Sequence, residues 1–219
     1  MKEPADIVKA KGLIAGGLSL DTSKDIRLRF GLDMLGVPFQ YVTGYRSSPP
    51  ARLALQRGEI HIFSESPPSY RSVVVPQLIK TGQAIPVWYD EVADPPTPSK
   101  QLEGLTIQSF PQLYRAIKGA PPSGRLWDGY KMLYDMSSTL LRVVALPPGT
   151  PPAALAALSK AITQLNDDKD FAAEAMKVME FVPEYTTAPD LSPKVRAMLV
   201  ATPEMRTYIN DYMRNVPKK

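Results

Sequence analysis

Short apolar runs alternate with helical patterns along the first 90 residues. The run at 13–15 ends at two glycines, and the segment after it repeats apolar residues at Ile26, Phe30 and Met34 before Gly36. That four-residue spacing predicts a helix that ends at the glycine. Strands are expected at 13–15, 39–42, 60–63 and 85–88, with further helices at 51–57 and 70–80. This alternation predicts an α/β fold with a mostly parallel sheet and helices on both faces.

The rest of the chain is predicted to be mainly helical. The Pro-rich stretch at 90–100 indicates a surface loop, and helical patterns follow at 110–118 and 126–136 before a strand-like run at 140–146. After the segment PPGTPP, helices are expected at 153–165, 171–179, 192–200 and 203–214. We therefore expect an α/β lobe over residues 1–146 and a helical segment over 147–219.

Composition and charge narrow the class of protein. The 219 residues are 44% hydrophobic and 22% charged, which is typical of a globular protein, and none is a cysteine. The net charge of +4 is spread along the chain rather than gathered in a patch, so nucleic-acid binding is not expected. No apolar stretch approaches the roughly 20 residues that cross a bilayer. The N-terminal residues lack the apolar core of a signal peptide, so the chain as written is expected to stay in the cytoplasm.

Polar loops follow three of the predicted strands, at 16–23, 43–50 and 64–70. In parallel sheets ligands bind at the carboxyl ends of the strands, and the start of a helix there favours an anion. The second loop adds Tyr45 and Arg46, an aromatic wall and a forked donor for a carboxylate. Serine, proline and glycine are also ordinary turn residues, so these loops taken singly fit a purely structural role.

The sequence contains none of the common catalytic motifs. The single histidine, His61, lies within the strand-like EIHIF and is interpreted as structural. The pair Asp90 and Glu91 is interpreted as solvated charge rather than an acid/base pair. The acidic residues near Asp168 are expected to cap a helix rather than bind calcium. We therefore predict no catalytic residue, no metal and no cofactor.

The order of these features resembles a known family. The segments IAGGLSLDTSKDIRLRFGLDMLG, YVTGYRSSPPARLALQRGEIHIF, SYRSVVVPQLIKTGQAIPV and VVALPPGTPPAALAALSKAITQLNDDKDF are similar to the extracytoplasmic solute receptors of tripartite tricarboxylate transporters, the Bug or TctC family. The resemblance covers most of residues 5–185. It implies a periplasmic binding protein, without catalysis, whose two α/β lobes close over a small carboxylate, and whose partners are membrane transporter subunits.

The resemblance also implies which residues bind the ligand. Donors from the three loops are Gly17, Ser19, Thr22, Ser23, Tyr45, Arg46, Ser47, Ser64 and Ser66. Asp21 and Glu65 depart from the family pattern. A protein carboxylate about 5 Å from a bound carboxylate would weaken binding by about 1 kcal/mol in a partly wet site. The expected ligand is a small carboxylate or amino-carboxylate, and these two residues indicate that it carries an amine or an amide, unless the site no longer functions.

Family members are longer, with an N-terminal lobe that has no counterpart here. By this comparison residues 1–146 resemble the second lobe and 147–219 resemble the returning part of the first. The tail would then lack its usual cover over Leu155, Leu158, Ile162, Phe171 and Met176. Either the flank of the lobe itself or a second copy of the chain must cover them, and a homodimer is the commonest way to bury such a patch. The alternatives are a small doubly wound α/β enzyme and an interaction module derived from an orphaned lobe.

Overall fold

The computed structural model describes residues 1–93, 95–96, 102–139, 143–186 and 201–215. They form two compact units. The first comprises Met1–Asp135 together with 201–215, and the second comprises the described residues between 136 and 186. The expected boundary at residue 146 therefore differs from the observed division, which falls within one helix and returns the last described helix to the first unit. None of the helices in these ranges has the length and apolar character required to span a bilayer.

A parallel sheet of three strands lies at the centre of the first unit. The strands are β1 (Leu13–Gly16), β2 (Phe39–Val42) and β3 (Ile62–Phe63), in the order β2-β1-β3. Leu13 lies opposite Phe39, and Ala15 lies opposite Ile62. The predicted parallel α/β arrangement is confirmed. Because β1 is central, the chain crosses over it between β2 and β3, which makes the carboxyl ends of the strands a candidate ligand edge.

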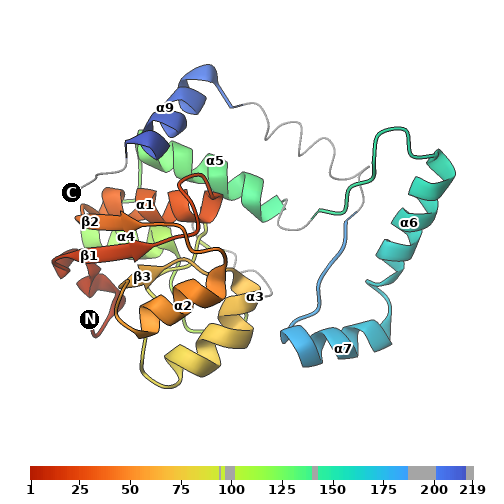
Figure 1. Ribbon diagram of the computed structural model, residues 1–219, viewed down its shortest axis with the longest axis horizontal. Coiled ribbons are helices and arrows are strands. Elements are labelled where there is room, and N and C mark those ends of the chain that lie inside the picture. The colour runs from red at the N-terminus through yellow and green to blue at the C-terminus, as the bar shows by residue number, and fades with distance from the viewer. Residues whose placement is uncertain (94, 97–101, 140–142, 187–200, 216–219) are drawn as a thin grey trace. The chain divides into compact units, whose positions relative to one another are not determined.

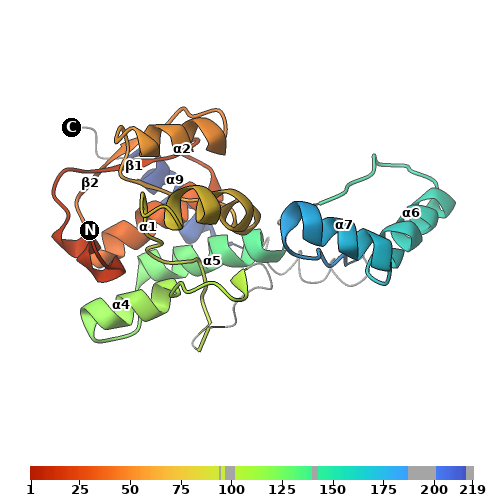
Figure 2. The same cartoon turned by 90° about the horizontal axis from the view of Figure 1, so that it is seen from below.

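Helices cover both faces of this sheet. On one side lie α1 (Ser23–Leu35), α4 (Phe110–Lys118), α5 (Arg125–Thr139) and α9 (Pro203–Arg214), and on the other lie α2 (Ser48–Gln56), α3 (Pro67–Ser69) and the π-helix η2 (Tyr70–Ile79) (Figures 1 and 2). A short 3-10 helix, η1 (Pro4–Lys9), precedes β1. The bounds of α1 and α4 match the sequence prediction closely, because each ends at a glycine with positive φ, Gly36 and Gly119.

The main core lies between β1 and the helices on the α1 side. Buried side chains from α1, α4, α5 and α9 meet there, among them Phe30, Phe110, Tyr130 and Ile209. Helix α1 is buried on almost every side, and it carries three charged residues into the interior, Asp25, Arg27 and Arg29. Buried charges require partners, so these three residues organise the surrounding loops.

Two predicted elements of the first unit differ from the structure. The expected strand at 85–88 does not form; a single bridge joins Tyr89 to Ser109 instead. Pro86 lacks an N–H group and so cannot complete a ladder. The expected helix at 70–80 is present, but it is a π-helix that contains Pro76. The proline removes an internal hydrogen bond, which favours the wider turn.

The second unit contains α6 (Pro152–Gln164) and α7 (Lys169–Met179), as predicted. Asp168 caps α7, accepting hydrogen bonds from the N–H groups of Asp170 and Phe171 at 2.9 Å, which confirms its structural role. The strand expected at 140–146 does not form over residues 143–146, and residues 140–142 lie outside the described ranges, as does the predicted helix at 192–200. Among the described residues of this unit, seven large apolar side chains are exposed: Val143, Val144, Leu146, Leu155, Leu158, Met176 and Val178.

Candidate functional site

The three loops singled out in the sequence lie at one edge of the sheet. They follow β1, β2 and β3, which are parallel, so all three leave the sheet at its carboxyl edge. The N–H of Gly17 donates to the carbonyl of Val42 at 2.9 Å, and the N–H of Gly44 donates to that of Leu18 at 3.3 Å. The ammonium of Lys24 donates to the carbonyl of Ser64 at 2.8 Å. The prediction of a common edge is confirmed.

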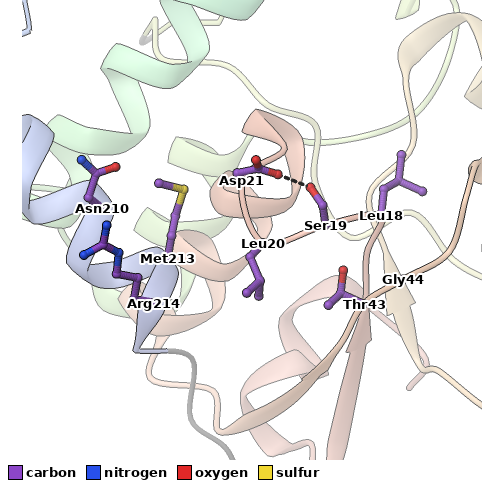
Figure 3. Close-up of a pocket in the computed structure, with 9 residues that line it drawn as sticks. All are labelled: Leu18, Ser19, Leu20, Asp21, Thr43, Gly44, Asn210, Met213 and Arg214. Atoms are coloured by element: carbon purple, nitrogen blue, oxygen red, sulfur yellow. Dashed lines mark hydrogen bonds between the residues drawn. The ribbon is translucent and has the colours of Figure 1, made fainter.

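A pocket of about 530 Å³ opens at this edge, between two of the loops and α9. Figure 3 shows α9 on one side and the loops after β1 and β2 on the other. The lining residues are Leu18, Ser19, Leu20, Asp21, Thr43, Gly44, Asn210, Met213 and Arg214. A pocket of this size accommodates a small organic molecule.

Two opposite charges line the pocket without neutralising each other. Asp21, on the loop after β1, accepts a hydrogen bond from the hydroxyl of Ser19. Arg214 lies near the end of α9 and is exposed. Among the described residues, neither side chain forms an ion pair. The pocket therefore offers a carboxylate and a guanidinium that are both open to a ligand.

A buried arginine, Arg29, contacts the elements that carry the pocket residues. Arg29 is 1% exposed, and it donates hydrogen bonds to the carbonyls of Leu20 and Asp25. Its guanidinium lies 4.7 Å from the ring centre of Tyr41 on β2 and 5.4 Å from that of Tyr212 on α9. One of its terminal nitrogens has no hydrogen-bond partner among the described residues. Arg29 thus links the loop after β1, strand β2 and helix α9, which stabilises the arrangement around the pocket.

The tyrosines around Arg29 complete this support. The hydroxyl of Tyr41 donates to the carbonyl of Ser19 at 2.8 Å. The hydroxyl of Tyr212 donates to the carboxylate of Asp33 on α1. Burial, reinforced by the nearby carboxylates of Asp25 and Asp33 respectively, raises the pKa of Tyr41 and of Tyr212, so both hydroxyls stay protonated at neutral pH.

The carboxylate of Asp25 accepts hydrogen bonds from backbone N–H groups of the loop after β1, where an anion was expected to bind. This carboxylate is fully buried and accepts hydrogen bonds from the N–H groups of Leu18 at 2.7 Å and Ser19 at 3.3 Å. The ammonium of Lys24 lies 2.9 Å from the other carboxylate oxygen. The loop after β1 is thus held by an internal carboxylate, so these two N–H groups are not open to a bound anion.

The predicted ligand residues of the first loop fall into two groups. Ser19 lines the pocket. Gly17 and Thr22 support it, because Gly17 donates to Val42 and the Thr22 hydroxyl lies 2.6 Å from that of Ser19. Ser23 faces elsewhere: its hydroxyl donates to the carbonyl of Leu133 at 3.2 Å and accepts from Arg27 at 2.7 Å.

The predicted residues of the other two loops lie outside the pocket lining. Tyr45 is half-buried, Arg46 and Ser47 are exposed, and Ser47 precedes α2. Ser64 accepts from Lys24 through its carbonyl, and Ser66 precedes α3. Glu65, expected to repel a bound carboxylate, is paired with Arg52 instead. A ligand contact by these residues, or by Gly17, Thr22 and Ser23, stays a prediction.

Three lining residues, Asn210, Met213 and Arg214, come from α9 and were not predicted. The sequence indicated an amphipathic helix at 203–214, but it placed that helix in the tail. Ile209 is 7% exposed within the core, and Tyr212 meets the ring of Phe30 at 4.5 Å, so the apolar face of α9 packs on α1. No local signal in the sequence identifies that partner.

Asp90 and Glu91 are not solvated charges, which corrects the sequence interpretation. Asp90 lies 2.7 Å from Arg27 and accepts a hydrogen bond from Tyr130 at 2.6 Å. Glu91 is 5% exposed and accepts from two backbone N–H groups. Burial, with Asp90 adding to it, raises the pKa of Tyr130 well above its ordinary value. This network joins α1 to α5 and lies outside the pocket lining.

The remaining candidates have structural roles. His61 accepts a hydrogen bond through Nδ1 from the N–H of Ile14 at 3.1 Å, as expected of a histidine that supports the sheet. Within the described ranges, no group of three or more histidine or acidic residues could hold a metal ion. In comparisons with family models, curated proteins and solved structures, no match to the chain was found.

Proposed function

We propose that this protein binds a small carboxylate solute and acts as a receptor rather than as an enzyme. The observation that carries the proposal is the pocket at the carboxyl edge of a parallel sheet, with Arg214 open on one wall. An arginine without an ion-pair partner is a strong recognition group for a carboxylate, because its guanidinium presents paired donors. The Thr43 hydroxyl and the Asn210 amide, which also line the pocket, can donate further hydrogen bonds.

The absence of catalysis is part of this proposal. Of the nine lining residues, Ser19 is hydrogen-bonded to a carboxylate, and none is a histidine, cysteine or lysine that could act as its base or as a nucleophile. Tyr130, whose pKa is strongly raised, lies in the network between α1 and α5. The chemistry available in the pocket is recognition by charge and hydrogen bonding.

The physiological setting follows from the sequence resemblance. We propose that the receptor works outside the cytoplasmic membrane, in the periplasm, and delivers its solute to a transporter of the tripartite tricarboxylate type. The α/β fold and the clustering of the three loops at one edge support this assignment.

Ligand screening tests the binding function. A panel of small monocarboxylates, dicarboxylates and amino acids is added during thermal unfolding, while NMR follows the integrity of each compound. A true ligand at 100 times its Kd stabilises by about 2.7 kcal/mol, which raises the Tm by roughly 5 to 10 °C. We expect such a shift for at least one carboxylate without turnover. No shift for any carboxylate contradicts the proposal, and steady conversion of a compound favours an enzyme.

A substitution of Arg214 tests whether the carboxylate binds in this pocket. Arg214→Gln removes the guanidinium charge, so the affinity for the carboxylate should fall about tenfold. Arg57→Gln is the matched control, because Arg57 lies on the same unit with its side chain 63% exposed. Equal affinity in the two variants would show that the carboxylate binds elsewhere.

A further inference from the structure

The two open charges of the pocket point to a narrower ligand class, an inference that rests on the proposed binding function. We propose that the ligand is an amino acid with an apolar side chain, whose ammonium contacts Asp21 and whose carboxylate contacts Arg214. The charges come from two different segments, the loop after β1 and α9 (Figure 3). Since they are not paired with each other, a ligand that joins them must itself carry both signs.

Asp21 forms the pole for the ammonium group. One of its carboxylate oxygens accepts the Ser19 hydroxyl, and the other has no partner among the described residues. An ammonium donates up to three hydrogen bonds, so it can use the open oxygen. A ligand with a carboxylate alone would meet Asp21 as a like charge, so this residue discriminates against simple carboxylates.

Arg214 forms the pole for the carboxylate. Asn210 lies four residues earlier on α9, so both side chains project from the same face of the helix and both line the pocket. A guanidinium binds a carboxylate through two parallel hydrogen bonds, and the Asn210 amide can add a third. A plain amine would find no acceptor with a negative charge at this pole.

Apolar side chains lie among these polar groups. Leu18, Leu20 and Met213 line the same pocket, and Leu20 is 39% exposed. An apolar ligand side chain would bury this surface. The volume of about 530 Å³ leaves space for a side chain the size of leucine or phenylalanine beside the two charged groups.

Two matched sets of compounds test the assignment by calorimetry. The first is leucine, 4-methylpentanoate without the amine, and 3-methylbutylamine without the carboxylate. The second is phenylalanine, 3-phenylpropanoate and phenethylamine. We expect at least one amino acid to bind about tenfold or more tightly than both of its single-charge analogues, because each lost charged hydrogen bond removes roughly that factor.

Single substitutions test which charged group of the ligand contacts Asp21 and which contacts Arg214. In Asp21→Asn the amide oxygen still accepts the Ser19 hydroxyl, but the preference for the amino acid over the carboxylate analogue should vanish. In Arg214→Gln the preference over the amine analogue should vanish. Asp128→Asn and Arg57→Gln are matched controls on exposed side chains of the same unit, and they should retain both preferences.

The outcomes separate this inference from the proposed function. If a carboxylate analogue binds as tightly as its amino acid, the zwitterion assignment is overturned and the carboxylate receptor stands. If both amino acids bind but the Asp21 and Arg214 variants behave like the controls, the pocket assignment is overturned. If neither amino acid binds while another carboxylate does, the ligand class is wrong, and if no carboxylate binds, both proposals fail.

Discussion

Substitution of Asp25 by alanine should destabilise the first unit more than any surface change. The carboxylate is fully buried, and it accepts hydrogen bonds from the N–H groups of Leu18 and Ser19 and pairs with the ammonium of Lys24. Alanine removes all three acceptor contacts at once. The two N–H groups and the ammonium are then left without this partner.

The expected loss follows from these contacts. Each buried N–H left without a partner costs about 1 to 3 kcal/mol. Removing one member of a buried ion pair costs about 3 to 5 kcal/mol. The loss should stay below the sum of these values, because the Ser19 contact is long at 3.3 Å and Lys24 keeps the carbonyl of Ser64 as an acceptor. We therefore expect a loss of about 3 to 5 kcal/mol, a large part of a typical stability of roughly 5 to 15 kcal/mol.

Urea unfolding followed by tryptophan fluorescence measures this loss in the first unit alone. Both tryptophans, Trp88 and Trp127, pack against Phe110 in that unit, at ring distances of 5.6 and 6.0 Å. With a slope of about 2 kcal/mol per M, the midpoint should fall by roughly 2 M. Asp25→Asn keeps one acceptor and should lose less.

The control is Asp128→Ala, whose carboxylate is 54% exposed and pairs with Lys131 on the surface of α5. That change should stay within about 0.5 kcal/mol. If Asp25→Ala unfolds at the same urea concentration as this control, then Asp25 does not hold the loop and the account of the site is refuted.

Three further predictions concern pH, packing and assembly. Burial first, and then the carboxylates of Asp90 and Asp33, raise the pKa of Tyr130 and Tyr212, so these tyrosines stabilise the fold fully below the unfolded value near pH 10. This stability should be lost as the pH rises above 10, and an unchanged urea midpoint between pH 9 and 11.5 would contradict the shift. In Gly17→Ala the new methyl would lie 1.8 Å from the Tyr41 hydroxyl, so we expect a loss of about 1 to 3 kcal/mol that shrinks in a Tyr41→Ala background. Light scattering should show a dimer, because Leu155 and Met176 are 47% and 51% exposed, and Met176→Lys should return it to a monomer; a monodisperse wild-type monomer would count against this expectation.

Local patterns alone determined the α/β class and most helix positions. The alternation of short apolar runs with amphipathic segments is a property of neighbouring residues, and a parallel sheet is its usual consequence. The common edge of the three loops followed from that topology without any knowledge of contacts. Helix ends were predictable where a glycine adopts positive φ, as at Gly36. The predicted strand at 85–88 failed because pairing depends on a partner, and Pro86 cannot donate to one.

The tertiary structure decided which polar residues are exposed and which are buried. Asp90 and Glu91 read as loop charges in the sequence, yet Arg27 and Tyr130 enclose Asp90, and Glu91 is buried against backbone donors. Asp25 lies in the first turn of α1, and its carboxylate accepts hydrogen bonds from the N–H groups of the preceding loop. Arg214 entered the pocket because the apolar face of α9 packs on Phe30, a contact between residues almost the whole chain apart. Such pairings depend on shape and charge in three dimensions, whereas periodicity in the sequence reports only that a face exists, not what covers it.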